Sequence, residues 1–288
     1  MLKRWKIMRT KYVTTKLSNG QKIYQVDHPC CTATISEFGG QLLSFQDQQG
    51  EEWLWLSKSA IKDGSKAIRG GVPICWPWFG PNDDKTLPQH GYARLVNWAL
   101  VSVEEDEFGV RLTLQPDFVN SKYEIYNLSL FMKIDLGTSL SIQLHTENIS
   151  NFSVSFSQAI HTYLAVDDIK ECSISGLNGC VYLDQLKNKI SHQENDLVLS
   201  QWTDSIYSNV QNPITLAHNG KTSKIIDGNG HDSVVIWNPW QDGARLLSDF
   251  DDLGYQNMIC IEMANTATKT LAPRQSHTLT QIISIPKS

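Results

Sequence analysis

The chain has 288 residues, of which 19% are charged, and a formal net charge of −5. A chain of this length can bury a sizeable core, either as one large domain or as two smaller ones. Its acidic balance offers no broad basic field, so we expect no nucleic-acid partner. No apolar run approaches the roughly 18 residues of a membrane span, so we expect no membrane partner.

The N-terminal segment and the cysteines both favour a cytoplasmic protein. Five basic residues lie within positions 3–11, but the 13–16 segment that follows lacks the apolar run of a secretory leader. The six cysteines contain no C-x-x-C pair, and their spacing matches no disulfide framework. We therefore expect free thiols. Cys75 has no histidine near it in sequence, which argues against a catalytic thiol.

Strand and turn signals begin early in the chain. Asn19-Gly20 is a typical hairpin dipeptide. The segment 53–68 is one of two places where we expect a helical turn or two. Apolar and polar residues then alternate over 110–114, 126–134 and 140–144, the last being the Leu140, Ile142, Leu144 ladder. This period of two indicates strands with one buried face.

Residues 68–94, which lie between the 53–68 segment and the alternating runs that begin at 110, differ from the rest of the chain. IRGGVPICWPWFG at 68–80 and PQHGYAR at 88–94 place cationic and amide side chains among glycines, aromatic rings and four prolines, which prevent a regular helix. Rings cover the apolar faces of a sugar, whereas Arg and Gln donate to hydroxyls or a phosphate. The segment indicates a site for a polar, anionic small molecule. The candidate binding residues are Arg69, Gln89, His90 and Arg94.

The second half of the chain continues the strand pattern. Asn219-Gly220 is another hairpin signal, and 252–258 is the second place where a helical turn is expected. No repeat or Pro/Ser-rich linker marks a domain boundary. We predict one domain over residues 1–288, an all-β protein built as a large antiparallel β-sandwich with few short helices. The later runs with strand character lie at 153–166, 233–238, 257–265 and 277–285.

Two titratable residues lie inside these strand-like runs, His161 in SFSQAIHTYLAV and Glu262 in MICIEMAN. A carboxylate within an apolar strand is unfavourable unless it is paired or functional, because desolvation raises its free energy. Glu262 is therefore a candidate base, with a solvent-facing strand position as the alternative. For His161 the alternative is a core histidine bonded to a backbone carbonyl.

These motifs resemble the hexose-6-phosphate mutarotases of the aldose 1-epimerase superfamily, over nearly the whole chain. The SGLNG-x-x-Y-x-D stretch at 175–184 and TDSIY at 203–207 are part of the likeness. It implies a β-supersandwich, no metal or organic cofactor, and interconversion of the α and β anomers of a hexose 6-phosphate, first of all D-glucose 6-phosphate. It makes His161 the general acid and Glu262 the general base. The residues that it assigns to the sugar phosphate are Arg69, Gln89, Arg94 and Asp204, with His90 close by.

The sequence departs from the family pattern in two places. The family often has an acidic residue before the Thr-Asp pair and a basic one after it, where this chain has Trp202 and Ser205. A proline commonly follows the catalytic glutamate, where this chain has Met263. The first departure concerns part of the sugar or phosphate contact and the second concerns backbone stiffness. Neither replaces a proton-transfer group.

The residue types suit anomer exchange. A base must take the C1 hydroxyl proton while an acid protonates the ring oxygen, and the roles reverse when the ring closes on the other face. An imidazolium and a carboxylate supply both steps without a cofactor, and a histidine with a pKa near 6.5 is partly protonated at neutral pH. We expect His161 and Glu262 to face each other across a pyranose-sized gap, with ionised Glu262 raising the protonated fraction of His161.

Several alternatives stay open. A metal enzyme could use His90, His161 and Glu262, but the chain lacks the H-x-H spacing of cupin-type sites. A non-catalytic carbohydrate-binding protein could share the fold. A mutarotase for free aldoses would leave the two loop arginines unpaired, and Asp204 could instead form an Asx turn. We expect a monomer that binds a small sugar phosphate. Four tryptophans are candidates for a sugar platform, and we expect no more than one or two of them to serve as one. The four are Trp76, Trp78, Trp237 and Trp240.

Overall fold

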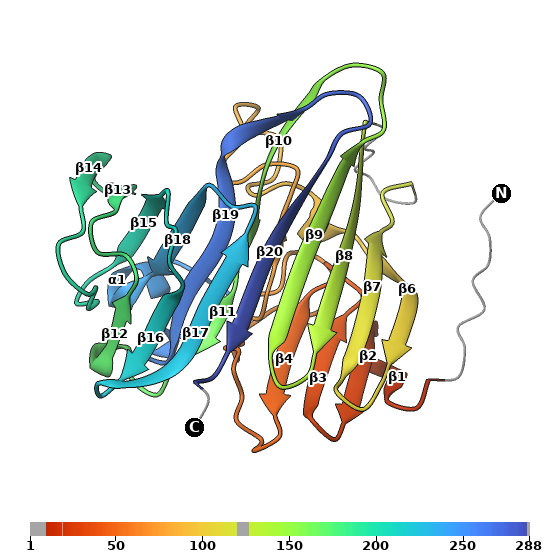
Figure 1. Cartoon of the computed structure of the whole chain (residues 1–288), viewed down its shortest axis with the longest axis horizontal. Helices are drawn as coiled ribbons and strands as arrows, with labels where there is room; N and C mark the ends of the chain where they lie inside the picture. Colours follow the sequence, from red (N-terminus) through yellow and green to blue (C-terminus); the bar gives the residue numbers. More distant parts are fainter. Residues whose placement is uncertain (1–9, 19, 120–126, 287–288) are drawn as a thin grey trace.

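The computed structural model describes residues 10–18, 20–119 and 127–286 and consists mainly of antiparallel β-strands (Figure 1). The basic residues at positions 3–9 and Tyr126 of the expected 126–134 strand lie outside the described residues. The described strands form three sheets, and all their pairings are antiparallel. The prediction of an all-β antiparallel sandwich is confirmed, whereas a single domain over 1–288 stays a prediction.

The first sheet is a meander near the N-terminus with the order β1-β2-β3-β4. Tyr24 on its second strand donates to the backbone carbonyl of Trp98 at 3.4 Å, so the meander lies against the start of the strand β6 (Trp98–Glu105). The strands are β1 (Val13–Ser18), β2 (Gln21–His28), β3 (Cys31–Ser36) and β4 (Leu42–Asp47).

The second sheet, called the β9 sheet, has the order β12-β16-β17-β20-β9-β8-β7-β6. Its central strands alternate strictly between buried and half-buried positions, as the sequence predicts. Asn219 and Gly220, with φ of 49° and 74°, form the tight hairpin between β16 and β17. The strands are β6 (Trp98–Glu105), β7 (Val110–Pro116), β8 (Leu128–Leu136), β9 (Leu140–Asn148), β12 (Cys172–Ser175), β16 (Ile214–His218), β17 (Lys221–Asn229) and β20 (Ser276–Ser284).

The third sheet, called the β19 sheet, has the order β14-β13-β15-β18-β19-β10-β5, and β11 also pairs with β19. Residues 258–265 of β19 are all buried, because neighbours cover both of its faces. The strands are β5 (Ile74–Cys75), β10 (Val154–Ile160), β11 (Tyr163–Ala165), β13 (Val181–Asp184), β14 (Lys189–His192), β15 (Thr203–Ser208), β18 (Ser233–Asn238) and β19 (Met258–Leu271).

The two faces of β19 meet different surroundings. Ile259, Ile261 and Met263 belong to the main apolar core, which also contains inward residues of the β9 sheet. Cys260 and Ala264 belong to smaller clusters on the opposite face. Because side chains alternate along a strand, Glu262 projects on that opposite face, away from the main core.

Helical structure is sparse and only partly where it is expected. The segment 252–258 contains the short 3₁₀ helix η3 (Gly254–Asn257), as predicted. The segment 53–68 forms no helix, so that prediction was wrong. The Trp53 and Trp55 amides donate to the carbonyls of Phe45 and Tyr163, both at 2.9 Å, which holds the chain extended between strands. The other short helices are η1 (Ala93–Leu95), η2 (Ile169–Glu171) and α1 (Trp240–Ala244).

Within the described part of the chain, no helix has the length and apolar character needed to cross a bilayer.

Candidate active site

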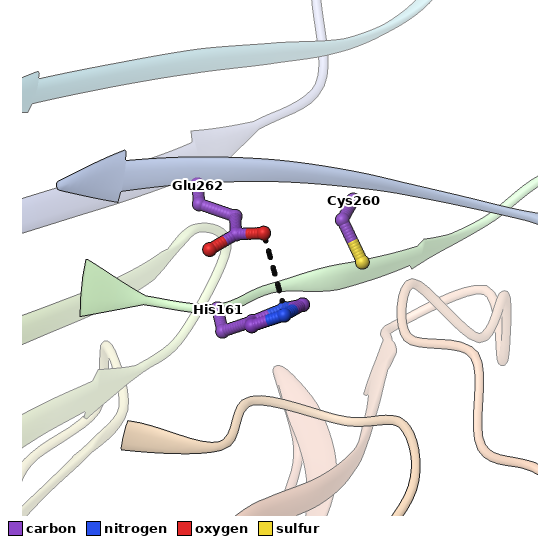
Figure 2. A group of neighbouring side chains, drawn as sticks. All are labelled: His161, Cys260 and Glu262. Carbon is purple, nitrogen blue, oxygen red and sulfur yellow. Dashed lines mark ion pairs between the residues drawn. The ribbon is translucent and has the colours of Figure 1, made fainter. Parts of the chain in front are cut away.

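Strand register brings His161 and Glu262 together. Ile160 pairs with Met263 and Tyr163 pairs with Cys260, so His161, in the gap between β10 and β11, lies across from Glu262. His161 Nδ1 is 3.3 Å from Glu262 Oε1, and Figure 2 shows the two side chains meeting. Both are buried, with exposed fractions of 8% and 1%.

The direct contact corrects one expectation from the sequence. We expected a gap the size of a pyranose ring between the imidazole and the carboxylate. Adjacent strands lie about 4.7–4.9 Å apart, so side chains opposite one another on the same face touch. Apart from the contact between His161 Nδ1 and Glu262 Oε1, neither His161 Nδ1 nor Glu262 Oε2 has a hydrogen-bond partner among the described residues.

A buried amide supports this strand pair from the side of the main core. Gln281 on β20 accepts a hydrogen bond from the Thr162 hydroxyl and donates to the Ile261 carbonyl at 2.8 Å. Thr162 and Ile261 are the neighbours of His161 and Glu262, and the Ile261 amide donates to the Thr162 carbonyl at 3.2 Å. One side chain of the β9 sheet therefore links the two segments that carry the pair.

The pair lies in a cavity of about 410 Å³, within the usual range for small-molecule sites. All seven residues selected from the sequence line it. Of the four candidate platform tryptophans only Trp237 is in the lining, with its ring centroid 6.2 Å from that of His161. The seven are Arg69, Gln89, His90, Arg94, His161, Asp204 and Glu262.

Tyr163, Gln185 and Trp202 are among the lining residues that sequence reasoning did not select. Tyr163 follows His161 by two positions, and its ring stacks on the imidazole with 4.9 Å between centroids. Gln185 directly follows the 175–184 stretch and donates to Asp204 Oδ1 at 2.6 Å. Asp204 lies within β15, so it is not part of an Asx turn. Trp202, noted only as a departure from the family pattern, also lines the cavity, and its indole nitrogen has no described partner.

The PQHGYAR segment is fixed against the WPW segment by close backbone packing. Gly91 has φ of +73°, and a Cβ atom there would lie 2.1 Å from the Trp76 carbonyl oxygen. His90 next to it also has a positive φ, of 64°, and its Nδ1 accepts from the Gly80 amide at 3.1 Å. Burial and nearby Arg94 hold the pKa of His90 well below its ordinary value. His90 is thus a neutral imidazole whose remaining hydrogen is on Nε2.

The two arginines are held in different ways. Arg69 Nη1 donates to the Tyr163 hydroxyl at 3.0 Å, and its Nε lies 3.3 Å from Asp249 Oδ1. Arg94 Nη2 donates to the Gln89 carbonyl at 2.8 Å, while its buried Nε has no described partner. Arg69 is therefore already paired in the structure, contrary to the expectation that both arginines would be unpaired without a phosphate.

A second cavity of about 320 Å³ adjoins the first. Arg69, Gln89, Arg94 and Tyr163 line both cavities. Lys66 belongs to the second and lies 3.4 Å from Asp249 Oδ2. The shared wall thus concentrates cationic side chains beside a space that extends beyond the acid–base pair.

Burial sets the protonation of the pair. Desolvation lowers the pKa of His161, and the positive charges of Arg94 and Arg69 lower it further. Desolvation raises the pKa of Glu262, and the neighbouring Asp204 charge adds to this effect. The two pKa shifts contradict the expectation that ionised Glu262 raises the protonated fraction of His161. The cost of desolvating the two charges outweighs the attraction between them. The favoured form is a neutral imidazole beside a carboxylic acid.

The structure groups a different set of potential metal ligands from the His90, His161 and Glu262 set considered from the sequence. In the described ranges, the His/Cys/Asp/Glu group able to surround one ion consists of His161, Cys260 and Glu262. His90 is not in this group, so the set of His90, His161 and Glu262 is not assembled.

Comparisons with known proteins agree with this architecture. A family model described as aldose 1-epimerase matches residues 22–284. A Salmonella typhimurium relative, provisionally named glucose-6-phosphate 1-epimerase, is 33% identical over 269 residues, or 91% of this chain and 90% of the relative. A Cenchrus ciliaris relative with the same provisional name is 34% identical over 251 residues, or 81% and 75%. A Salmonella typhimurium crystal structure, provisionally described as a mutarotase, has a TM-score of 0.89 and 30% identity, covering 98% of this chain and 96% of that one.

Proposed function

The chain belongs to the aldose 1-epimerase family and interconverts sugar anomers. We propose that its substrate is a hexose 6-phosphate, with D-glucose 6-phosphate as the first candidate. The observation that carries this proposal is the position of the His161–Glu262 pair in a cavity whose wall contains two arginines. A neutral sugar ring would lie against the pair and the rings. A phosphate would lie toward Arg69 and Arg94, where the second cavity gives it room. The names of the two relatives suggest the same substrate.

Direct contact between the two groups suits the geometry of the hemiacetal. The C1 hydroxyl oxygen and the ring oxygen are both bonded to C1, so the two proton transfers take place at neighbouring atoms. A carboxylate and an imidazole in contact can therefore serve both oxygens from one side of the ring. This replaces the arrangement in which acid and base flank the sugar.

We assign ring opening to a proton exchange that leaves the total charge of the pair unchanged. His161 as imidazolium gives a proton to the ring oxygen, and Glu262 as carboxylate takes one from the C1 hydroxyl. The C1–ring oxygen bond breaks, its electrons stay on the ring oxygen, and C1 becomes an aldehyde. Rotation about the C1–C2 bond presents the other face, and closure returns both protons.

The electrostatics of the site support this assignment. Opening converts an imidazolium–carboxylate pair into a neutral imidazole and a carboxylic acid. Burial favours that second form, because it lowers the pKa of His161 and raises that of Glu262. Opening therefore starts from the less favoured, charged form of the pair and ends in the favoured neutral form, which accompanies the open-chain aldehyde.

One observation favours a second candidate, a mutarotase for free aldoses. Arg69 is paired with Asp249 and Tyr163, so it does not require a phosphate to be satisfied. The unpartnered Arg94 Nε favours the phosphorylated substrate, because a buried guanidinium donor without an acceptor is unfavourable. Arg94 therefore distinguishes the two substrates.

The test follows anomer exchange by NMR. Pure α-glucose 6-phosphate is dissolved at low temperature with a catalytic amount of protein, and α-glucose is treated in parallel. We expect faster equilibration than in buffer for both sugars, with kcat/KM at least tenfold higher for the phosphate. Equal values would favour the free-aldose enzyme. No acceleration of either sugar would contradict the enzyme and favour a binding protein on the same fold.

A further inference from the structure

A third reactive side chain lies beside the acid–base pair. Cys260 is two positions before Glu262 on β19 and therefore projects on the same face. Its thiol, His161 Nδ1 or Nε2 and a Glu262 oxygen all lie within 4.8 Å of one another, and Figure 2 shows the three side chains together. Cys260 does not line the cavity, and the proton transfers described above do not use it.

We propose that His161, Cys260 and Glu262 form a binding site for a thiophilic divalent cation, with Zn²⁺ as the best fit, and that the bound ion blocks anomer exchange. Cation binding stands on the geometry of the three side chains alone. The blocking effect rests on the proposed function of His161 and Glu262.

The distances suit a tetrahedral ion. With Zn–N and Zn–O bonds of about 2.0–2.2 Å, a tetrahedral site separates these two donors by about 3.4 Å. The observed separation between His161 Nδ1 and Glu262 Oε1 is 3.3 Å. With a Zn–S bond of about 2.3 Å, the thiolate must lie about 3.6 Å from each of the other donors. A rotation of the Cys260 side chain from its present place within 4.8 Å can supply the difference.

The donor types select the ion. One thiolate, one imidazole and one carboxylate suit Zn²⁺, whereas Mg²⁺ and Ca²⁺ prefer six or more oxygen ligands. Three protein ligands leave a fourth position, which water or a sugar hydroxyl from the cavity can fill. His161 Nδ1, one of the two donors just measured, is buried and has no hydrogen-bond partner among the described residues, so an ion displaces none of its hydrogen bonds.

The charges around the site are mixed. Arg94 lies near both His161 and Glu262 and opposes a cation, whereas Asp204 lies near Glu262 and favours one. Arg69 is offset by its ion pair with Asp249. The thiolate and the Glu262 carboxylate add two negative charges when the ion displaces their protons. The local charge therefore allows a divalent ion.

Binding has a direct functional consequence. The ion takes the imidazole and carboxylate lone pairs that proton transfer requires, so an occupied site cannot open the hemiacetal. The ion also lies at the floor of the sugar cavity, which makes its effect depend on sugar concentration.

The closing experiment uses Co²⁺ as a spectroscopic substitute for Zn²⁺. The purified full chain is titrated with Co²⁺, and we expect a near-ultraviolet thiolate-to-metal band together with the visible bands of a tetrahedral ion. The band should vanish in Cys260→Ser and in His161→Ala and should disappear on addition of Zn²⁺. Cys75→Ser is the matched control, because Cys75 is another buried thiol outside the three-donor group, and it should keep the band.

Anomer exchange is then measured with and without Zn²⁺, each protein being compared with its own metal-free rate. We expect Zn²⁺ to slow the wild type and Cys75→Ser by more than tenfold, a chelator to restore them, and Cys260→Ser to change less than threefold. Absence of the Co²⁺ band in the wild type, or its persistence in a folded Cys260→Ser variant, would overturn the site. A normal band with no anomer exchange at all would overturn the proposed function and leave the metal site intact.

Discussion

The β9 sheet and the β19 sheet differ in how their central strands are buried. β8 and β9 alternate between buried and half-buried residues from end to end. Residues 258–265 of β19 are buried at every position. The first pattern comes from one core face and one outer face. The second comes from a strand with the main core on one face and, on the other, smaller apolar clusters together with the cavity at Glu262.

This difference shows where function can be placed in such a fold. A polar side chain on the outer face of β9 is only half-buried and keeps part of its contact with solvent. A polar side chain on the cavity face of β19 is desolvated, so its proton affinity changes and it can carry out proton transfer. The alternating strands build the scaffold, and the strand buried on both faces carries the reactive group.

The largest expected effect is on kcat, and it should differ between the His161–Glu262 pair and a histidine and a glutamate on β9. His161→Ala and Glu262→Gln should each lower kcat by roughly 10²- to 10⁴-fold, because each removes one proton-transfer group. His145→Ala and Glu147→Gln on β9 should keep near-wild-type rates, as neither residue lines the cavity. NMR anomer exchange measures all four. A β9 variant as slow as His161→Ala or Glu262→Gln would remove the functional distinction between the sheets.

The next effect concerns the phosphate. Arg94→Gln should raise KM for glucose 6-phosphate by roughly 10- to 100-fold, the worth of a charge-assisted hydrogen bond, and change free-glucose use less than threefold. Arg111→Gln on β7 is the control, because Arg111 pairs with Asp135 on the β9 sheet. Steady-state kinetics on both sugars gives the comparison. Equal losses on the two substrates would show that Arg94 does not contact the phosphate.

A smaller effect is expected where the β9 sheet supports the pair. Gln281→Met removes the bonds to Thr162 and Ile261, so kcat should fall about tenfold with little change in KM, because the pair loses its alignment. Unfolding should become easier by about 1–3 kcal/mol. Asn148→Ala removes buried amide bonds far from the pair and should cost similar stability at normal kcat. Denaturant unfolding and kinetics together separate positioning from general destabilisation.

Packing gives a further contrast. Ala264 on β19 is fully buried, so Ala264→Val should destabilise the protein by about 1–3 kcal/mol through overpacking. Ala99 on β6 is exposed, and Ala99→Val should stay within about 0.5 kcal/mol of the wild type. Urea midpoints measure both. Similar small shifts would show that the second face of β19 is loosely packed.

The smallest expected effect is a change in how stability depends on pH. Because the pKa of His161 is lowered in the folded protein, its contribution to the free energy of unfolding is present above pH 6.5, its ordinary pKa. That contribution is lost as the pH falls toward the pKa of the folded state. Because the pKa of Glu262 is raised in the folded protein, its contribution to the free energy of unfolding is present below pH 4.5, its ordinary pKa. That contribution is lost as the pH rises toward the pKa of the folded state. Between pH 4.5 and 6.5 the two contributions have opposite slopes.

Glu262→Gln removes one of these slopes. The free energy of unfolding of this variant should therefore rise with pH between 4.5 and 6.5 more steeply than that of the wild type, by at most about 1.4 kcal/mol per pH unit. Glu147→Gln is the control and should follow the wild-type slope. Parallel curves for Glu262→Gln and the wild type would mean that Glu262 binds no extra proton in the folded state.

Much of the fold and of the site can be predicted from the sequence. Alternation predicts β8 and β9, and all seven side chains selected by the residue motifs line the cavity. The contact between His161 and Glu262 cannot be predicted from the sequence, because it depends on the register of β19 with β10 and β11. The ion pair of Arg69 with Asp249 joins residues 180 positions apart, and no local pattern reports such a pair.

The most direct test of the account is a double-variant cycle on the anomer exchange rate of glucose 6-phosphate. If His161 and Glu262 work as one proton-transfer unit, the His161→Ala/Glu262→Gln double variant should be within about threefold of the slower single variant. If the two single losses multiply in the double variant, the groups act independently and the account is contradicted.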